Sequence, residues 1–194
     1  MRINTPLLLI SLFLSTACLA QPALSLRKMQ TARTQTAPKI DGKITDSVWN
    51  QVTPVSGFII NSPDFGKPAK LKTEVWVLYD DAAMYIAAKL TDQPRSIRKQ
   101  LTARDGEQRQ DVDYFSVFLD TYNDNQNGFQ FVVTSRNVQS DGRISPNIQS
   151  QFGPPSDYSW DAVWESNVQL TSDGWTVEMR IPYISLRFSK TEKQ

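Results

Sequence analysis

Aromatic and amide side chains gather in one stretch that lacks the strict alternation of a β-strand. Gln151, Phe152, Tyr158 and Trp160 lie there among Ser, Pro and Gly residues. Aromatic rings stack on apolar C–H faces, while amides and hydroxyls hydrogen-bond to ligand hydroxyls, which together suits a saccharide. The alternative is that Trp160 closes one end of the fold, because large aromatic side chains are usually packed. We predict that these four residues contact a ligand.

Trp76 is a further candidate from a strand-like segment. Its side chain alternates with those of Val75 and Val77, so the tryptophan and the valines lie on opposite faces. A β-sandwich that buries one face of each sheet would leave Trp76 exposed if the valines point inward. Trp164 and Trp175 also lie in alternating segments, and we expect both in the core.

Acidic and amide oxygens in two loops could bind a metal ion. The candidate ligands are Asp111, Asp113, Asp120, Asn123 and Asp124. Such hard oxygen ligands favour calcium, although the glycine and the final glutamate of an EF-hand loop are missing at the required spacing. The alternative is an ordinary hairpin turn, in which Asn and Asp are favoured residues.

Paired carboxylates could instead cleave glycosidic bonds. That reaction needs two carboxyl groups roughly 5–9 Å apart across a cleft. Glu165 and Glu178 could approach one another in a hairpin, and Asp105, Asp111 and Asp113 are further candidates. The alternative is that all of them are solvated side chains, since no sequence signal indicates a cleft.

The composition excludes several other kinds of chemistry. The 194 residues include no histidine and one cysteine, which argues against most zinc, haem and Ser-His-Asp sites and against an internal disulfide. Lys and Arg number 21 against 20 Asp and Glu, so a nucleic-acid partner that binds by bulk charge is not expected. No nucleotide-binding glycine motif is present.

The first residues are predicted to direct export. A basic start, a short apolar run and small residues before Ala20 predict a signal peptide over residues 1–20. An alternative is lipidation of Cys18, although Leu14 lies one residue too far from it, and another is an uncleaved anchor. We expect residues 21–37 to be a linker, no transmembrane helix in the mature chain, and a bacterial periplasmic, envelope or extracellular location.

The segments that must position the candidate residues have a period of two. Short alternating runs rich in β-branched and aromatic residues are separated by turn signals, which predicts an all-β, antiparallel β-sandwich over residues 38–188. Residues 189–194 form a tail. The expected strands are 73–79, 84–90, 113–120, 129–134, 162–170 and 175–181.

In this order and spacing, several segments resemble the carbohydrate-binding module family 9-like domain. No single segment is diagnostic, but together they cover about residues 38–188. The matching segments are 38–42, 46–49, 77–86, 113–120, 160–165 and 174–182.

The resemblance implies a jelly-roll-like sandwich that binds glycans and commonly holds structural calcium. Such modules are often attached to xylanases and other glycoside hydrolases. The chain is most similar to a bacterial subgroup in which this domain precedes a C-terminal outer-membrane-barrel-like domain, which is absent here and suggests a truncated reading frame. We therefore expect a non-catalytic module that binds a polysaccharide of the xylan or cellulose type. The alternatives are a structural periplasmic N-terminal domain of an outer-membrane protein, without a sugar site, and a hydrolase of O-glycosyl bonds.

Overall fold

The computed structural model describes residues 28–106, 111–148 and 156–189. The predicted signal peptide, Gln151 and Phe152 lie outside these ranges. Within them, the chain forms the strands β1 (Ala32–Arg33), β2 (Thr73–Tyr79), β3 (Ala83–Thr91), β4 (Tyr114–Leu119), β5 (Gly128–Thr134), β6 (Gln139–Ile144), β7 (Ser156–Asp157), β8 (Glu165–Thr171) and β9 (Gly174–Pro182), and the short 3-10 helices η1 (Ser47–Gln51) and η3 (Tyr183–Ser185).

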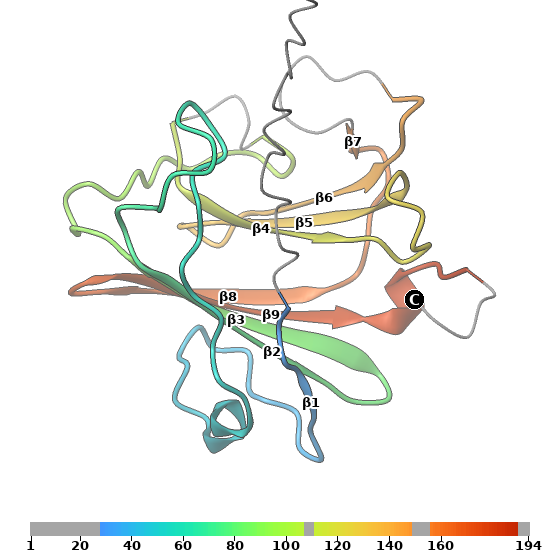
Figure 1. Cartoon of the computed structure of the whole chain (residues 1–194), viewed down its shortest axis with the longest axis horizontal. Helices are drawn as coiled ribbons and strands as arrows, with labels where there is room; N and C mark the ends of the chain where they lie inside the picture. Colours follow the sequence, from blue (N-terminus) through green and yellow to red (C-terminus); the bar gives the residue numbers. More distant parts are fainter. Residues whose placement is uncertain (1–27, 107–110, 149–155, 190–194) are drawn as a thin grey trace, which may run out of the picture.

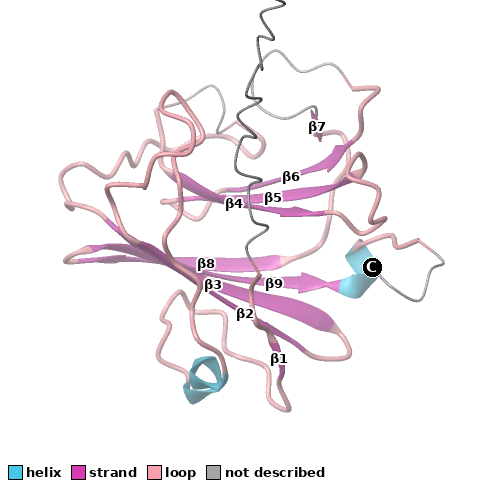
Figure 2. Ribbon diagram, in the orientation of Figure 1, coloured by secondary structure: helices cyan, strands magenta, loops and turns pink. Residues whose placement is uncertain are grey.

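These strands form two sheets packed face to face, as Figures 1 and 2 show. The first sheet has the order β1-β2-β3-β9-β8 and the second has the order β4-β5-β6-β7. Neighbouring strands are antiparallel, except that β1 pairs with β2 in parallel. The predicted all-β, antiparallel sandwich is confirmed.

The alternation of β4 decides which of its side chains fill the space between the sheets. Phe115, Val117 and Leu119 pack against the main core cluster. Tyr114 and Phe118 point to the opposite face and are exposed. Successive side chains of a strand point to opposite faces, so this pattern follows directly from the sequence.

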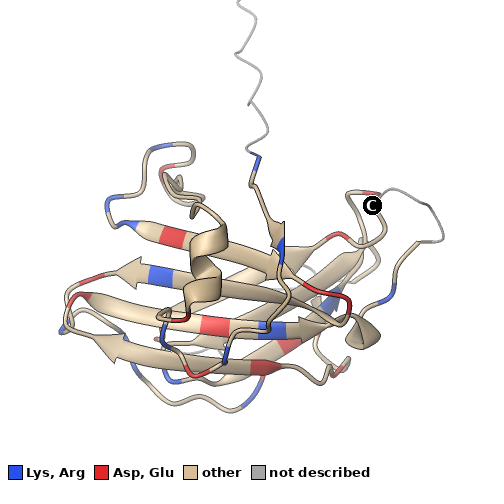
Figure 3. Ribbon diagram, turned by 90° about the horizontal axis from the view of Figure 1, so that it is seen from below, with Lys and Arg blue, Asp and Glu red and all other residues tan. Residues whose placement is uncertain are grey.

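The first sheet is covered on its outer face as well, which corrects the assumption that each sheet buries one face. A second core cluster on this face includes Trp49, Leu78, Tyr85 and Ala87, and Trp76 packs against it. Figure 3 looks onto this face and shows η1 lying across the strands. Trp76 is therefore half-buried beneath the segment that leads to β2, and it is not exposed to solvent as predicted.

The strands β1, β6 and β7 were not predicted. In β1, Ala32 pairs with Leu78 of β2, and the nearby Thr34 is buried. The C-terminal part of the linker predicted for residues 21–37 is therefore part of the fold. The strand β6 reads Gln-Ser-Asp-Gly-Arg-Ile, which lacks an apolar alternation. Two of its central residues have structural reasons to be small or polar. Tyr158 lies close to Gly142, and Asp141 accepts a hydrogen bond from Trp164 Nε1.

No helix in the described ranges is both long and apolar enough to cross a lipid bilayer.

Candidate functional site

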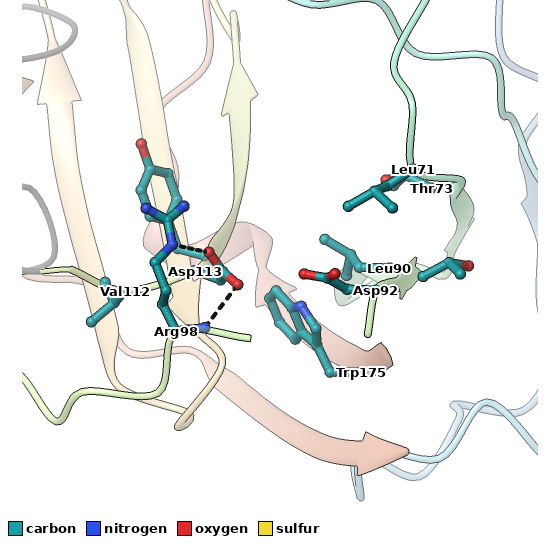
Figure 4. A pocket seen from close by; sticks show the side chains of 10 residues that line it. Leu71, Thr73, Leu90, Asp92, Arg98, Val112, Asp113 and Trp175 are labelled. Atoms are coloured by element: carbon teal, nitrogen blue, oxygen red, sulfur yellow. Dashed lines mark hydrogen bonds and ion pairs between the residues drawn. The ribbon is translucent and has the colours of Figure 1, made fainter. Parts of the chain in front are cut away.

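A groove of about 430 Å³ lies where one end of the first sheet meets the start of β4. Figure 4 shows Leu71, Leu90, Asp92 and Trp175 on one side, and Arg98, Val112 and Asp113 on the other. Both apolar and hydrogen-bonding side chains contribute to the wall. The complete lining consists of Leu71, Thr73, Leu90, Thr91, Asp92, Arg98, Val112, Asp113, Tyr114 and Trp175.

Arg98 is held in the groove by two carboxylates. Its Nε donates to Asp113 Oδ1 at 2.8 Å, and its backbone N–H donates to Asp113 Oδ2 at 3.0 Å. Its Nη1 donates to Asp111 Oδ1 at 3.0 Å. The hydrogen bonds with Asp113 and then Asp111 raise the pKa of the guanidinium further, so it stays charged. Among the described residues no acceptor contacts Nη2, so this group can donate to a ligand.

Exposed apolar surface lies on both sides of the groove. Tyr114 is 47% exposed and Leu71 is 51% exposed, although both line the groove. Across the groove, Asp92 Oδ1 accepts the Gln93 N–H at 2.6 Å, while Oδ2 accepts no hydrogen bond from the described part of the chain. The groove thus offers a flat ring, a hydrogen-bond donor and an acceptor, which together can bind a neutral polyhydroxylated ring.

The aromatic residues predicted from the sequence are mostly packed. The Trp160 ring lies 4.7 Å from that of Phe129 and 6.1 Å from that of Phe131, measured between centroids. Tyr158 is half-buried against β6, and Trp76 packs under the first sheet. None of these three lines the groove, so their contact with a ligand stays a prediction.

The predicted metal ligands separate into two places. Asp111 and Asp113 form ion pairs with the guanidinium of Arg98, so their negative charge is already partly compensated. Asp120 accepts backbone N–H groups of its own loop, as Asp124 also does. Asn123 adopts a φ of 54°, as expected of a turn residue.

The described residues contain no group of three acidic, His or Cys side chains that could surround a metal ion. Calcium takes six to eight oxygen ligands, which include backbone carbonyl and amide oxygens as well as carboxylates. Structural calcium therefore stays a prediction without support from these side chains.

The carboxylates considered for catalysis do not face one cleft. Glu165 is exposed on β8 and accepts from Arg180 Nη1 at 2.9 Å. Glu178 on β9 is fully buried and accepts from the backbone N–H groups of Asp41 and Gly42 and from Trp49 Nε1, at 2.8–3.0 Å. Glu178 therefore anchors the segment that covers the first sheet.

The sequence analysis did not single out Arg98, Tyr114 and Asp92, which line the groove, as candidate site residues. Tyr114 carried a usable signal, because it lies opposite Phe115, Val117 and Leu119 in the alternation of β4. Arg98 and Asp92 lie in a segment without periodicity. Only the contact between the two sheets brings them together.

The two sheets packed face to face define the fold as a β-sandwich. The sequence matches the family described as "Carbohydrate family 9 binding domain-like" over residues 40–194, and the chain belongs to this family. Carbohydrate binding is the function that this membership assigns.

Several solved structures share the fold, and two of them hold a bound sugar. Both are carbohydrate binding modules of family 9 from Caldicellulosiruptor kristjanssonii, one in complex with cellotriose and one with glucose. The first is 20% identical with a TM-score of 0.55, and the match covers 84% of this chain and 69% of that chain. The second is 19% identical with a TM-score of 0.55, and the match covers 84% and 73% of the two chains. No curated protein sequence matches the chain.

Proposed function

We propose that the groove between the sheets binds a polysaccharide of the cellulose or xylan type. The half-exposed ring of Tyr114 beside the fixed guanidinium of Arg98 carries this proposal. A sugar residue stacks its C–H face on Tyr114 and accepts a hydrogen bond from Arg98 Nη2. Asp92 Oδ2 accepts from a second hydroxyl. No bond is broken, because the groove only holds the sugar.

The choice of glycan rests on chemistry and on the related folds. The groove mixes charges of both signs around an aromatic ring, which suits a neutral sugar better than an anionic one. The two family 9 structures hold cellotriose and glucose, both built from glucose units. We therefore use cellotriose as the first probe and xylotriose as the second.

We expect Tyr114→Ala to weaken cellotriose binding about tenfold, because the stacking surface is lost. Arg98→Gln should weaken binding about 10- to 100-fold, because a charged donor is removed. Isothermal titration calorimetry measures both changes, and the thermal unfolding of each variant shows whether the fold is kept.

The matched control is Tyr79→Ala, which removes another exposed tyrosine at the end of β2. This side chain does not line the groove, so its loss should leave the affinity unchanged. Equal losses of affinity in Tyr79→Ala and Tyr114→Ala would contradict the assignment of the site. Failure of the wild-type chain to bind either oligosaccharide would contradict the proposed ligand.

A further inference from the structure

A second hollow lies at the other end of β4. It has a volume of about 240 Å³ and is bordered by the exposed ring of Phe118 and the loop that follows β4. Its lining consists of Phe118, Leu119, Asp120, Asn125, Gln126, Asn127, Gly128 and Ile144. We call it the Phe118 hollow.

The loop of the Phe118 hollow presents amide groups from a fixed backbone. Asp120 accepts the backbone N–H groups of Tyr122, Asp124 and Asn125, the last at 2.8 Å. Within the described residues, the side-chain amides of Asn125 and Gln126 make no hydrogen bond. Both border the hollow beside an aromatic ring, so they can donate to and accept from hydroxyl groups there.

The groove and the Phe118 hollow are both lined by an aromatic side chain from the same face of β4. Tyr114 and Phe118 are 47% and 49% exposed on the same face of β4, with the half-buried Ser116 between them. Four residues of strand place the two rings about 13 Å apart. β4 is an edge strand of the second sheet and runs from one side of the sandwich to the other, as Figure 1 shows. One sugar ring cannot reach both aromatic surfaces, whereas an oligosaccharide can.

We propose that a cellulose-type glucan chain extends from the groove along β4 and fills the Phe118 hollow as a second subsite. This inference rests on the proposed function of the groove. In the second subsite a sugar residue stacks on Phe118 and hydrogen-bonds to the amides of Asn125 and Gln126. The module therefore binds several consecutive residues of an extended chain.

The test compares oligosaccharides of different length. Calorimetry with cellobiose and cellohexaose is carried out on the wild-type chain, Phe118→Ala and Asn125→Ala. We expect wild type to bind cellohexaose more tightly than cellobiose. Phe118→Ala should weaken cellohexaose binding about 5- to 10-fold and leave cellobiose binding unchanged. Phe65→Ala is the control, because this phenylalanine is 65% exposed and borders neither the groove nor the Phe118 hollow.

The outcomes separate the two proposals. Equal affinity for both oligosaccharides, lost in Tyr114→Ala but kept in Phe118→Ala, overturns the extended path and keeps the groove. Absence of any binding by the wild-type chain overturns both. An exposed edge strand can also pair with a second chain. If Phe118→Ala changes the sedimentation of the protein but not its glucan affinity, this face is a protein interface and the second subsite is wrong.

Discussion

At the residue scale, two buried carboxylates hold distant segments against the sheets. Glu178 on β9 accepts from Trp49 Nε1 at 3.0 Å, and Asp141 on β6 accepts from Trp164 Nε1 at 3.2 Å. Both carboxylates also accept backbone N–H groups, from Gly42 and Ala162 respectively. A buried polar group is costly unless it is hydrogen-bonded, so these acids fix the position of the indoles.

The charge of Glu178 depends on pH in a defined direction. Burial raises the pKa of this carboxyl above its ordinary value of 4.5, and the hydrogen bond from Trp49 opposes the rise. A carboxyl with a higher pKa in the folded state binds more protons there than in the unfolded chain. Its contribution to stability is therefore complete below the ordinary pKa and is lost as the pH rises through the raised pKa.

We expect Trp49→Phe to lower the free energy of unfolding by about 1.5–3 kcal/mol at a pH above the raised pKa of Glu178, because a hydrogen bond to a charged group is lost. The loss should be smaller at a pH below that pKa, where the carboxyl is protonated. Urea unfolding at one pH value on each side of the raised pKa measures the difference.

The control for this variant is Trp76→Phe in the same cluster. The Trp76 indole donates no hydrogen bond within the described part of the chain, so its replacement tests ring size alone. Its loss of stability should not depend on pH. A Trp49→Phe loss that is the same at both pH values would contradict the role assigned to the hydrogen bond.

At the scale of elements, the turn at Asp41 and Gly42 attaches the N-terminal segment to the first sheet. Gly42 has a φ of +82°, and a Cβ atom there would lie 2.7 Å from the backbone carbon of Val168 on β8. Thr176 on β9 donates to the carbonyl oxygen of Gly42 at 2.6 Å. A side chain at residue 42 would therefore push the turn away from both strands.

We expect Gly42→Ala to destabilise the protein more than Gly66→Ala. Gly66 has the same φ of +82°, but a Cβ atom there would meet nothing within 4 Å. Gly66→Ala should cost about 1–2 kcal/mol for the left-handed backbone alone. Gly42→Ala should cost about 1–3 kcal/mol more because of the contact with β8. Urea unfolding of both variants measures the difference, and equal losses would show that the turn does not press on the strand.

The strands that could be predicted from the sequence are those in which apolar residues recur regularly. β2, β3, β4, β5 and β9 carry apolar residues at alternate positions, and each was predicted within about two residues of its observed ends. β1 has only two residues and β6 is polar, so neither carries a local signal. Their pairing depends on neighbours that are distant in sequence.

At the scale of the whole molecule, the charge is nearly balanced. The chain has 21 basic and 20 acidic residues, and Figure 3 shows both signs spread over the outer face of the first sheet. Arg98 in the groove is itself neutralised by Asp111 and Asp113. Long-range attraction of a charged ligand is therefore not expected.

We expect the affinity for cellotriose to change less than about twofold between roughly 0.05 and 0.5 M sodium chloride, because stacking and hydrogen bonds to a neutral sugar are weakly screened. Calorimetry at both salt concentrations measures this change. A steep loss of affinity at high salt would instead indicate that ion pairing contributes to binding.

The sequence by itself determined the strands with alternating apolar residues and the sandwich that they form, because a period of two is a local property of the chain. It also placed Tyr114 and Phe118 on the face opposite the core side chains of β4. Only the tertiary structure decided which aromatic rings stay accessible. Trp160 is packed beside Phe129, and Trp76 lies under an N-terminal segment, because burial depends on which distant segments cover a face. The groove that joins Arg98 to Tyr114 arises in the same way, from contact between two sheets.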